Sequence, residues 1–247
     1  MKGIILAGGI GSRLYPLSRV TSKILLPVGK APMICYPIQK LKQAGVKDIC
    51  LVIGKENAGA IINFLGSGNE MGLDFTYKIQ EKAGGIAEAL GLTQGFVGND
   101  RCIVILGDNI FEDAISEHLK NFEQQKEGAK ILIKQVEDPK KYGVAEFEGD
   151  RITGIEEKPD IPKTNYCVTG IYMYDSSVFD IIKKIKPSKR GEMEITDVNN
   201  EYIRKGILTY DILSGWWIDA GTFESLDCAN NLVGSTEINL SDDIYGI

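Results

Sequence analysis

The chain has 247 residues, of which 43% are hydrophobic and 25% charged, so it has the composition of a globular protein and room for one large domain or two small ones. Its formal net charge of −6 argues against a nucleic-acid-binding surface, and no apolar run reaches the ~18 residues that a membrane span needs. The cysteines are odd in number and form no CxxC pair, and Met1-Lys2 leads directly into an apolar run without a signal peptide, so we expect reduced thiols in a cytoplasmic protein.

The first expected element is a strand over Lys2 to Ala7, an apolar run with the length and branching of a buried strand. It is followed by the loop Gly8-Gly9-Ile10-Gly11-Ser12-Arg13, in which three glycines in four positions allow a sharp turn and a close approach to a ligand. Backbone N–H groups in such a loop can converge on an anion, Arg13 adds a forked donor, and Lys23 follows as a second cation. Together these features indicate a triphosphate site, although glycine after a strand also makes an ordinary tight turn.

This loop matches neither of the two familiar phosphate-binding patterns. A Walker A loop needs Gly-x-x-x-x-Gly-Lys-Ser/Thr, and both Gly29-Lys30 and Gly54-Lys55 lack the first glycine and the final hydroxyl residue. The dinucleotide-binding fingerprint needs a third glycine three residues after the second, where this chain has Leu14. The loop is therefore neither a P-loop nor a standard Rossmann loop.

Strands and helices alternate through the rest of the first half. In chain order we expect a helix that carries Ile34, Ile38 and Leu41 and stops at Gly45, a strand over Asp48–Gly54, a helix over Ala58–Leu65, a strand over Leu73–Ile79, a helix from Gly85 to Leu90, a strand over Cys102–Leu106 and an amphipathic helix around His118. This alternation predicts an α/β fold with a doubly wound, mostly parallel sheet. Ligands bind beyond the carboxyl ends of such strands, which groups the Gly8–Arg13 loop, the segment from Gln80 to Ala89, and Gly107-Asp108.

The second half has mixed elements. We expect strands over Ala129–Val136, Tyr142–Phe147, Arg151–Ile155, Cys167–Tyr174 and Ile207–Leu213, and helices over Ser177–Ile185, over Ile195–Lys205 and from about Thr222 to Leu232. Glu148-Gly149-Asp150 is placed as a hairpin turn. No flexible linker separates the halves, so we expect a single domain over 1–247 with two lobes, about 1–128 and about 129–235.

Two aspartates are candidates for binding a metal ion. Asp108 follows a buried strand and a glycine, although an aspartate at a strand end is as often a turn residue or a helix cap. Nucleoside triphosphates bring Mg²⁺, which prefers carboxylate oxygen, and Asp219 is the candidate second carboxylate unless it caps the helix near Thr222. A zinc site is not expected, because His118 is the only histidine.

The run from Gly8 to Leu17, with Lys23-Ile24-Leu25-Leu26-Pro27-Val28 after it, resembles the signature of the sugar-nucleotide pyrophosphorylases, a family of nucleotidyltransferases. Within that family the chain is most similar to the glucose-1-phosphate thymidylyltransferases. The family usually has Thr where this chain has Ser12 and often Thr in place of Ser18, and both differences keep a hydroxyl. The similarity extends from Met1 to about Leu232, most of the chain.

The resemblance implies that the first lobe binds the nucleotide and the second binds the sugar. The nucleotide contacts that it implies are Leu6, Gly8, Gly9, Gly11, Ser12, Arg13, Gln80, Gly85 and Asp108, with Gln80 and Gly85 at the base. The sugar-phosphate contacts are Asn109, Tyr142, Gly143, Glu157, Lys158, Val168, Thr169, Arg190 and Trp217. It makes Arg13, Lys23 and Lys158 catalytic, and makes Asp108 and Asp219 the ligands of a Mg²⁺ cofactor. On sequence alone, Gln80 also fits an exposed loop and Glu157-Lys158 a solvated surface pair.

The implied reaction transfers a nucleotidyl group from dTTP to glucose 1-phosphate, giving dTDP-glucose for dTDP-rhamnose biosynthesis and pyrophosphate, by in-line attack on the α-phosphorus. Two alternatives remain: an enzyme that uses UTP or CTP, and a non-catalytic relative, which would be expected to lose the cations and aspartates that this chain retains. The resemblance also implies a homo-oligomer, with no nucleic-acid or membrane partner.

A last expectation concerns the C-terminus. Relatives are often longer there, where extra helices help to form a second nucleotide site. The segment Val233–Ile247 has no Lys or Arg and no room for two helices of roughly 11 residues each, so we expect a short form without that regulatory site.

Overall fold

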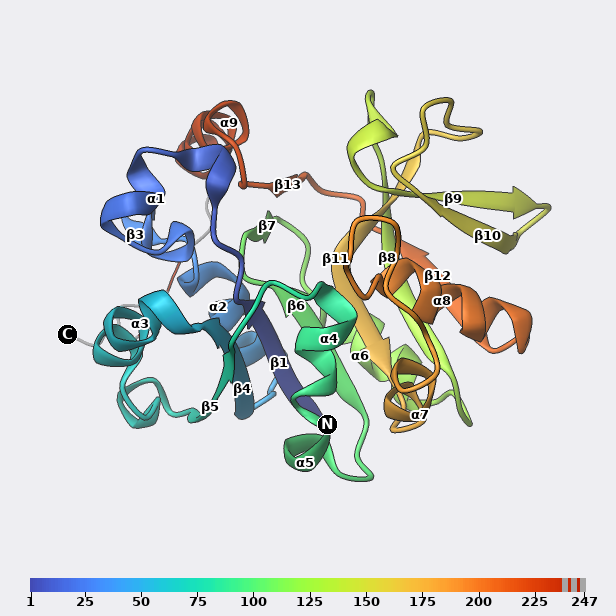
Figure 1. Ribbon diagram of the computed structural model, residues 1–247, viewed down its shortest axis with the longest axis horizontal. Helices are drawn as coiled ribbons and strands as arrows, with labels where there is room; N and C mark the ends of the chain where they lie inside the picture. Colours follow the sequence, from blue (N-terminus) through green and yellow to red (C-terminus); the bar gives the residue numbers. More distant parts are fainter. Residues whose placement is uncertain (237–239, 241–243, 245–247) are drawn as a thin grey trace.

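The computed structural model describes residues 1–236, 240 and 244, so the expectation for the C-terminal segment falls largely outside the described residues. A nine-stranded sheet continues through both halves of the chain and forms the centre of the fold (Figure 1). Its main path is β10 (Arg151–Glu157), β9 (Gly143–Glu148), β11 (Tyr166–Tyr174), β6 (Cys102–Leu106), β1 (Lys2–Ala7), β4 (Asp48–Gly54) and β5 (Asp74–Gln80), and β8 (Ala129–Gln135) joins β11 to β12 (Leu208–Ile212).

The half of the sheet formed by β5, β4, β1 and β6 is parallel throughout. β4, β1 and β6 read as continuous apolar runs because helices cover both faces of the sheet, whereas β5, at the edge of the sheet, alternates polar and apolar residues. On β1, Ile4 and Leu6 belong to one core while Ile5 and Ala7 belong to the other, as the two-residue period of a strand requires. The predicted bounds of β1, β4 and β6 are confirmed residue for residue.

The other half of the sheet is mixed. β11 is antiparallel to β6, β8 and β9, and β9 and β10 form an antiparallel hairpin across the predicted turn. β12 returns parallel to β8. The predicted α/β class with a mostly parallel first lobe and a mixed second lobe is therefore confirmed.

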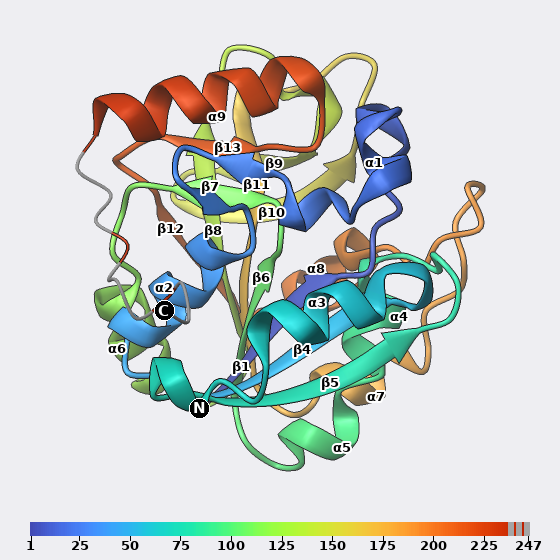
Figure 2. The same ribbon diagram turned by 90° about the vertical axis from the view of Figure 1, so that its left-hand side faces the viewer.

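Two layers of helices cover the sheet (Figures 1 and 2). The longer ones are α2 (Cys35–Gln43), α3 (Ala58–Leu65), α6 (Ser116–Glu123), α8 (Ile195–Arg204) and α9 (Phe223–Ser235), and the shorter ones are α1 (Leu17–Val20), α4 (Ile86–Gly91), α5 (Gln94–Val97) and α7 (Val178–Ile182). Buried side chains of α2, α3, α6 and α9 share one core, and those of α4, α5, α7 and α8 share the other. α7 is shorter than the predicted Ser177–Ile185, because the chain turns out of the helix after Ile182.

Four short strands were not predicted. β2 (Pro27–Val28) pairs with β3 (Ala31–Pro32), and β7 (Asn109–Phe111) pairs antiparallel with β13 (Trp217–Asp219). The second pairing joins the end of the first lobe to a segment more than one hundred residues later. In Figure 1, β7 and β13 lie side by side above the carboxyl ends of the parallel strands.

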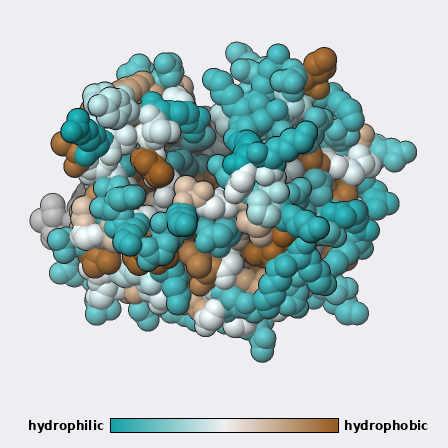
Figure 3. All heavy atoms as spheres, viewed as in Figure 1, coloured by the Kyte–Doolittle hydropathy of each residue, from teal (hydrophilic) through white to brown (hydrophobic). Residues whose placement is uncertain are grey.

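Polar residues dominate the face shown in Figure 3, with apolar residues scattered among them. This face is hollowed between the part that carries α1 and α9 and the part that carries β9 and β10 (Figures 1 and 3). Within the described part of the chain, every helix is too short or too polar to cross a membrane.

Candidate active site

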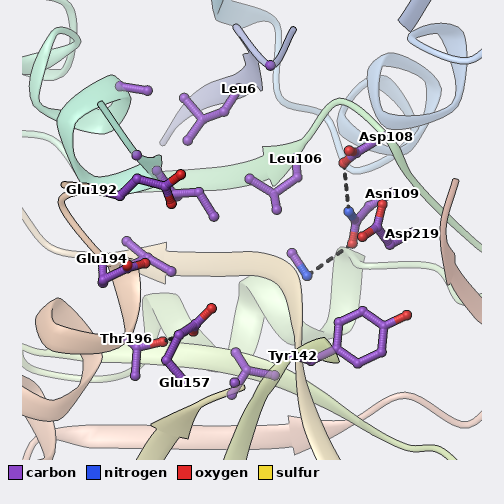
Figure 4. Close-up of a pocket in the computed structure, with 18 of the residues that line it drawn as sticks. Leu6, Leu106, Asp108, Asn109, Tyr142, Glu157, Glu192, Glu194, Thr196 and Asp219 are labelled. Atoms are coloured by element: carbon purple, nitrogen blue, oxygen red, sulfur yellow. Dashed lines mark hydrogen bonds between the residues drawn. The ribbon is translucent and has the colours of Figure 1, made fainter. Parts of the chain in front are cut away.

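A cavity of about 360 Å³ lies at the carboxyl ends of the parallel strands and reaches into the second lobe. The three stretches that topology grouped all contribute to its lining, through residues such as Gly8, Gln80 and Asp108. The second lobe contributes Lys141, Tyr142, Gly143, Glu157, Lys158, Val168, Gly170, Tyr172, Arg190, Glu192, Glu194, Ile195, Thr196 and Asn199. Figure 4 shows that the aspartates of this cavity lie at one end and Glu157, Glu192 and Glu194 at another.

Lys23 and Asp108 form a buried ion pair beside the glycine loop. Lys23 Nζ donates to Asp108 Oδ2. Burial alone would lower the pKa of Lys23 and raise that of Asp108, but their mutual attraction and hydrogen bond outweigh burial and move both pKa values the other way. A Cβ on Gly9 would lie 3.2 Å from Lys23 Nζ, so glycine lets the lysine lie directly against the loop.

The β7–β13 pairing brings Asp219 to Asp108. Asn109 is the register partner of Asp219, and Ala220 N–H donates to Asp108 O at 2.9 Å. Arg13 Nη2 lies 3.9 Å from Asp219 Oδ2. Burial raises the pKa of Asp219 to about 6, and the nearby charge of Asp108 adds to that effect. Two carboxylates and two cations from four parts of the sequence therefore meet at one end of the cavity.

This end of the cavity fits a hard divalent cation. Asp219 Oδ1 is buried and has no hydrogen-bond partner among the described residues, which is costly for a carboxylate oxygen unless a ligand completes the site. Asp108 and Asp219 supply two carboxylates, and no cluster of three or more His, Cys, Asp or Glu suited to a metal occurs in the described residues. Mg²⁺ is typically held in this way, by one or two carboxylates together with substrate phosphates.

Asn109 and Trp217, which the resemblance assigns to the sugar phosphate, line the cavity but use their polar atoms inside the protein. Asn109 is 1% exposed, and its Oδ1 accepts hydrogen bonds from Trp217 Nε1 at 2.7 Å and from Gly170 N–H at 3.0 Å. Asn109 Nδ2 donates to Asp108 Oδ1 at 3.1 Å. Tyr142 packs edge-on against Trp217, with ring centroids 5.1 Å apart. Asn109 therefore holds Asp108 in place.

The second-lobe end of the cavity is rich in paired charges. Glu157 Oε2 accepts from Thr196 Oγ1 at 2.5 Å, and Lys158 Nζ lies 3.6 Å from Glu157 Oε1. Lys158 has φ 47°, a left-handed conformation that is uncommon for a residue other than glycine and that clusters at functional sites. Arg190 donates three hydrogen bonds to the carboxylate of Glu194, and its Nη2 lies 3.2 Å from Glu192 Oε2.

At the third side of the cavity, Gln80 ends β5 and Gly85 precedes α4. Gly85 has φ 99°, and a Cβ there would collide with the backbone of Met193, so only glycine fits. Gly84 O accepts from Met193 N–H at 2.8 Å, which joins this turn to the second lobe. Gln80 and Gly85 both line the cavity.

Three predicted site residues lie outside the lining. Gly11 and Ser12 begin the short 3₁₀ turn that carries Arg13, away from the cavity. Thr169 is fully buried and its Oγ1 donates to Leu132 O at 2.7 Å, so its side chain is not available for the predicted sugar-phosphate contact. The reason is strand alternation, because Val168, Gly170 and Tyr172 face the cavity and Thr169 between them cannot.

The sequence assigned no individual role to part of the lining, although Ala83, Ile86 and Ala89 lie within the segment from Gln80 to Ala89 that topology grouped at the site. Ala83, Ile86, Ala89 and Leu106 contribute apolar surface, and Ile195, Thr196 and Asn199 contribute the start of α8. The last three lie at helical spacing, and Tyr172 lies two residues from Gly170 on the same strand face, so periodicity could have found these four. The short apolar residues near the glycine turn carry no comparable signal.

The fold and site define a nucleotidyltransferase, and comparison with known proteins agrees. A family model described as nucleotidyl transferase matches residues 2–235, so the chain belongs to that family. Its relatives include the glucose-1-phosphate thymidylyltransferases of Neisseria meningitidis, 43% identical over 96% of this chain and 84% of the relative, and of Mycolicibacterium smegmatis, 41% identical over 96% and 84%. The resemblance drawn from the glycine loop is thus confirmed.

Solved structures give the same result. A crystal structure from Bacillus anthracis, assigned as a glucose-1-phosphate thymidylyltransferase and determined with sucrose, has a TM-score of 0.94 and 57% identity, and the match covers 99% of this chain and 98% of that one. A UDP-glucose pyrophosphorylase solved with UDP-glucose has a TM-score of 0.84 at 24% identity over 93% and 97% of the two chains, which shows a shared fold only.

Proposed function

We propose that this protein transfers a thymidylyl group from dTTP to glucose 1-phosphate, giving dTDP-glucose and pyrophosphate. The observation that carries the proposal is one cavity with two charged ends. Arg13, Lys23 and the two aspartates lie at the end beside the glycine loop, and Lys158 and Arg190 lie at the other. Two phosphorylated substrates can meet between these two ends of the cavity. Relatives named glucose-1-phosphate thymidylyltransferase match 96% of this chain, which also supports the proposal.

The chemistry needs positioning and charge neutralisation more than proton transfer. A phosphate oxygen of glucose 1-phosphate forms a bond to the α-phosphorus of dTTP while the bond from that phosphorus to the bridging oxygen breaks. The electron pair leaves with pyrophosphate, and no proton moves because the attacking oxygen is already an anion. Arg13 and Lys23 stabilise the leaving pyrophosphate, where negative charge grows in the transition state. Lys158 orients the attacking phosphate.

Asp108 and Asp219 would hold Mg²⁺ in this proposal. When bound, the ion would neutralise charge on the α-phosphate. The unpartnered Asp219 Oδ1 supports the assignment, as does Asn109, which fixes one oxygen of Asp108 by a hydrogen bond. Arg190 would add positive charge near the sugar phosphate, with Glu192 and Glu194 holding its guanidinium in place.

The proposed compartment and assembly of the protein follow from its cysteines and from the family resemblance. Four of the five cysteines are buried free thiols, which supports a reducing compartment such as the cytoplasm. A homo-oligomer and a place in dTDP-rhamnose biosynthesis stay predictions from the family resemblance.

The test is a pyrophosphate-release assay over a panel of nucleoside triphosphates and sugar 1-phosphates. We expect the highest kcat/KM for dTTP with glucose 1-phosphate and a requirement for Mg²⁺. Lys158→Met should lose most of this activity, while Lys163→Met, which removes an exposed lysine paired with Glu146 outside the cavity, should keep it. Absence of release with every pair would refute an enzyme of this class, and a clear preference for UTP or CTP would refute the thymidylyl assignment.

A further inference from the structure

The turn between β5 and α4 contains a side-chain contact that orients the amide of Gln80 on the third side of the cavity, where the family resemblance places the base of the nucleotide. Gln80 is only 7% exposed and lines the cavity, whereas Glu88, two residues into α4, is half-buried behind it and does not line the cavity. Glu88 Oε2 accepts a hydrogen bond from Gln80 Nε2. A second acceptor, Gly85 O, lies 3.4 Å from the same nitrogen.

These two partners determine which way round the amide of Gln80 lies. A carboxylate and a backbone carbonyl can only accept hydrogen bonds, so the amide NH₂ of Gln80 must face them. The opposite orientation would place the amide oxygen against two acceptors in a nearly buried position, which is costly. Gly84 leaves the space for this arrangement, because a Cβ there would lie 3.2 Å from Glu88 Oε2.

The amide oxygen is therefore presented on the cavity side. Gln80 Oε1 lies against Gly8, where a Cβ would collide with it, and both residues line the cavity. Both side-chain hydrogen bonds that Gln80 makes to described residues use Nε2, so Oε1 remains available to accept one from a ligand. The cavity therefore has a hydrogen-bond acceptor, Gln80 Oε1, on its third side. Glu88, which does not line the cavity, fixes the orientation of that acceptor by binding Gln80 Nε2.

A fixed acceptor at this point distinguishes the pyrimidines. Thymine and uracil carry an N–H donor at N3, flanked by two carbonyls, which pairs with such an oxygen. Cytosine has a lone pair at N3, which the oxygen repels, and its nearest donor is the amino group one ring position away. A site built to hydrogen-bond one substrate rejects an analogue that leaves its polar group unpaired.

We propose that Glu88 is a positioning residue that fixes the Gln80 amide with its oxygen toward the base and thereby selects thymine or uracil over cytosine. This inference rests on the proposed function, because it assumes that the base of a nucleotide lies beside Gln80. The inference adds to the proposed function a positioning residue, Glu88, that does not touch the substrate. It also explains why the enzyme would prefer thymine or uracil to cytosine.

The measurement is the ratio of kcat/KM for dTTP to that for CTP, with glucose 1-phosphate as the acceptor. Glu88→Met removes the acceptor but keeps the length of the side chain, so the Gln80 amide is free to turn, and the ratio should fall about tenfold or more. Glu88→Gln removes the charge but keeps a carbonyl that can accept from Nε2, so it should retain most of the ratio. Glu81→Met is the matched control, since Glu81 lies in the same turn but is exposed and pairs with Lys55 at 3.0 Å.

Several results would overturn the proposal. A wild-type ratio near one would do so, as would an equal loss with both nucleotides in Glu88→Met, which would mark a merely structural role. Equal falls in Glu88→Met and Glu88→Gln would point to charge instead of amide orientation. If Glu88→Met does not fold, Glu88→Ala, a strong helix former within α4, takes its place with the same expected fall.

A double-mutant cycle and a binding experiment separate this idea from the proposed function. In a Gln80→Met background, Glu88→Met should change the ratio no further, because its effect acts through Gln80. Equilibrium binding of dTTP and of CTP, without a sugar phosphate, should show the same fall in selectivity. If no nucleotide is turned over but binding selectivity falls in Glu88→Met, the proposed reaction is refuted and the role of Glu88 is supported. If Glu88→Met is active and its selectivity is unchanged, the proposed reaction is supported and the role of Glu88 is refuted.

Discussion

Lys40 is a buried cation outside the cavity, and its environment predicts a measurable pH dependence of stability. It lies on α2 and is only 7% exposed, and its Nζ donates to Glu112 O at 2.6 Å and to Asp113 O at 3.0 Å. The ammonium group also lies 5.1 Å from the centroid of the Phe111 ring. Burial lowers the pKa of Lys40 from 10.5 to about 8, although the charges of Asp113 and Glu112 oppose that change.

The sign of the effect follows from proton linkage. Between pH 8 and 10.5 the unfolded chain keeps the proton on Lys40 while the folded chain loses it, so the free energy of unfolding rises with pH in that window. The pKa difference is 10.5 minus about 8, or about 2.5, and each pKa unit corresponds to about 1.36 kcal/mol. The full contribution is therefore about 3 kcal/mol, gained from pH 8 upward.

The assay is urea denaturation of the wild type and of Lys40→Met from pH 7 to pH 10, compared as a difference. The difference is needed because burial raises the pKa of the thiols of Cys35, Cys50, Cys102 and Cys167 to about 12, which lowers the stability of both proteins as pH rises above 9. We expect the wild type to gain about 2–3 kcal/mol relative to the variant by pH 10. Lys47→Met, at an exposed lysine, is the control and should give a constant difference. A constant difference for Lys40→Met as well would refute the reasoning.

Three further predictions address the site and its support. Asp108→Asn should abolish Mg²⁺-dependent turnover while leaving the fold intact, although it lowers stability by leaving the buried charge of Lys23 without its partner, and an unchanged Mg²⁺ dependence would rule out its metal role. Arg13→Ala should lower kcat by on the order of 10²–10³ with little change in KM for glucose 1-phosphate, because its partner is the leaving group; an effect confined to that KM would place Arg13 at the wrong end of the cavity. Thr222→Ala should lower the free energy of unfolding by about 1 kcal/mol in urea, since Thr222 Oγ1 caps α9 by accepting from Ser225 N–H at 3.2 Å, and no loss of stability would show that the cap contributes little.

The central strands could be predicted because they are buried on both faces, so nearly every residue in them is apolar. β1, β4 and β6 read as continuous apolar runs, and the glycines or polar residues that end them are equally visible in the sequence. The carboxyl ends of parallel strands meet at one edge, so topology alone could group Gly8, Gln80 and Asp108. The short strands β7 and β13 could not be predicted, because three residues are too few to show a period. Their pairing is nevertheless what brings Asp219 to Asp108.

The directions in which side chains point were also not fully predicted from the sequence. Alternation along β11 separates Val168 from Thr169, whereas the family resemblance implied both as sugar-phosphate contacts. The polarity of the Gln80 amide is a different case. It depends on Glu88, eight residues later and beyond a sharp glycine turn, so no periodic pattern relates the two residues. Only the folded turn makes an acceptor behind Gln80 visible.

Asn109 shows why a sequence cannot separate a ligand from its support. Both kinds of residue are polar, and both follow a buried strand, so the sequence gives Asp108 and Asn109 the same signal. Burial and hydrogen bonding separate them in the structure, because Asn109 accepts from Trp217 and Gly170 and donates to Asp108, which leaves its amide without a free oxygen to offer a sugar. Asp219 Oδ1, by contrast, is equally buried and has no partner among the described residues. Asn109, whose polar atoms the protein already satisfies, therefore supports the site, and the unsatisfied oxygen of Asp219 in the cavity lining is the atom that a ligand would complete.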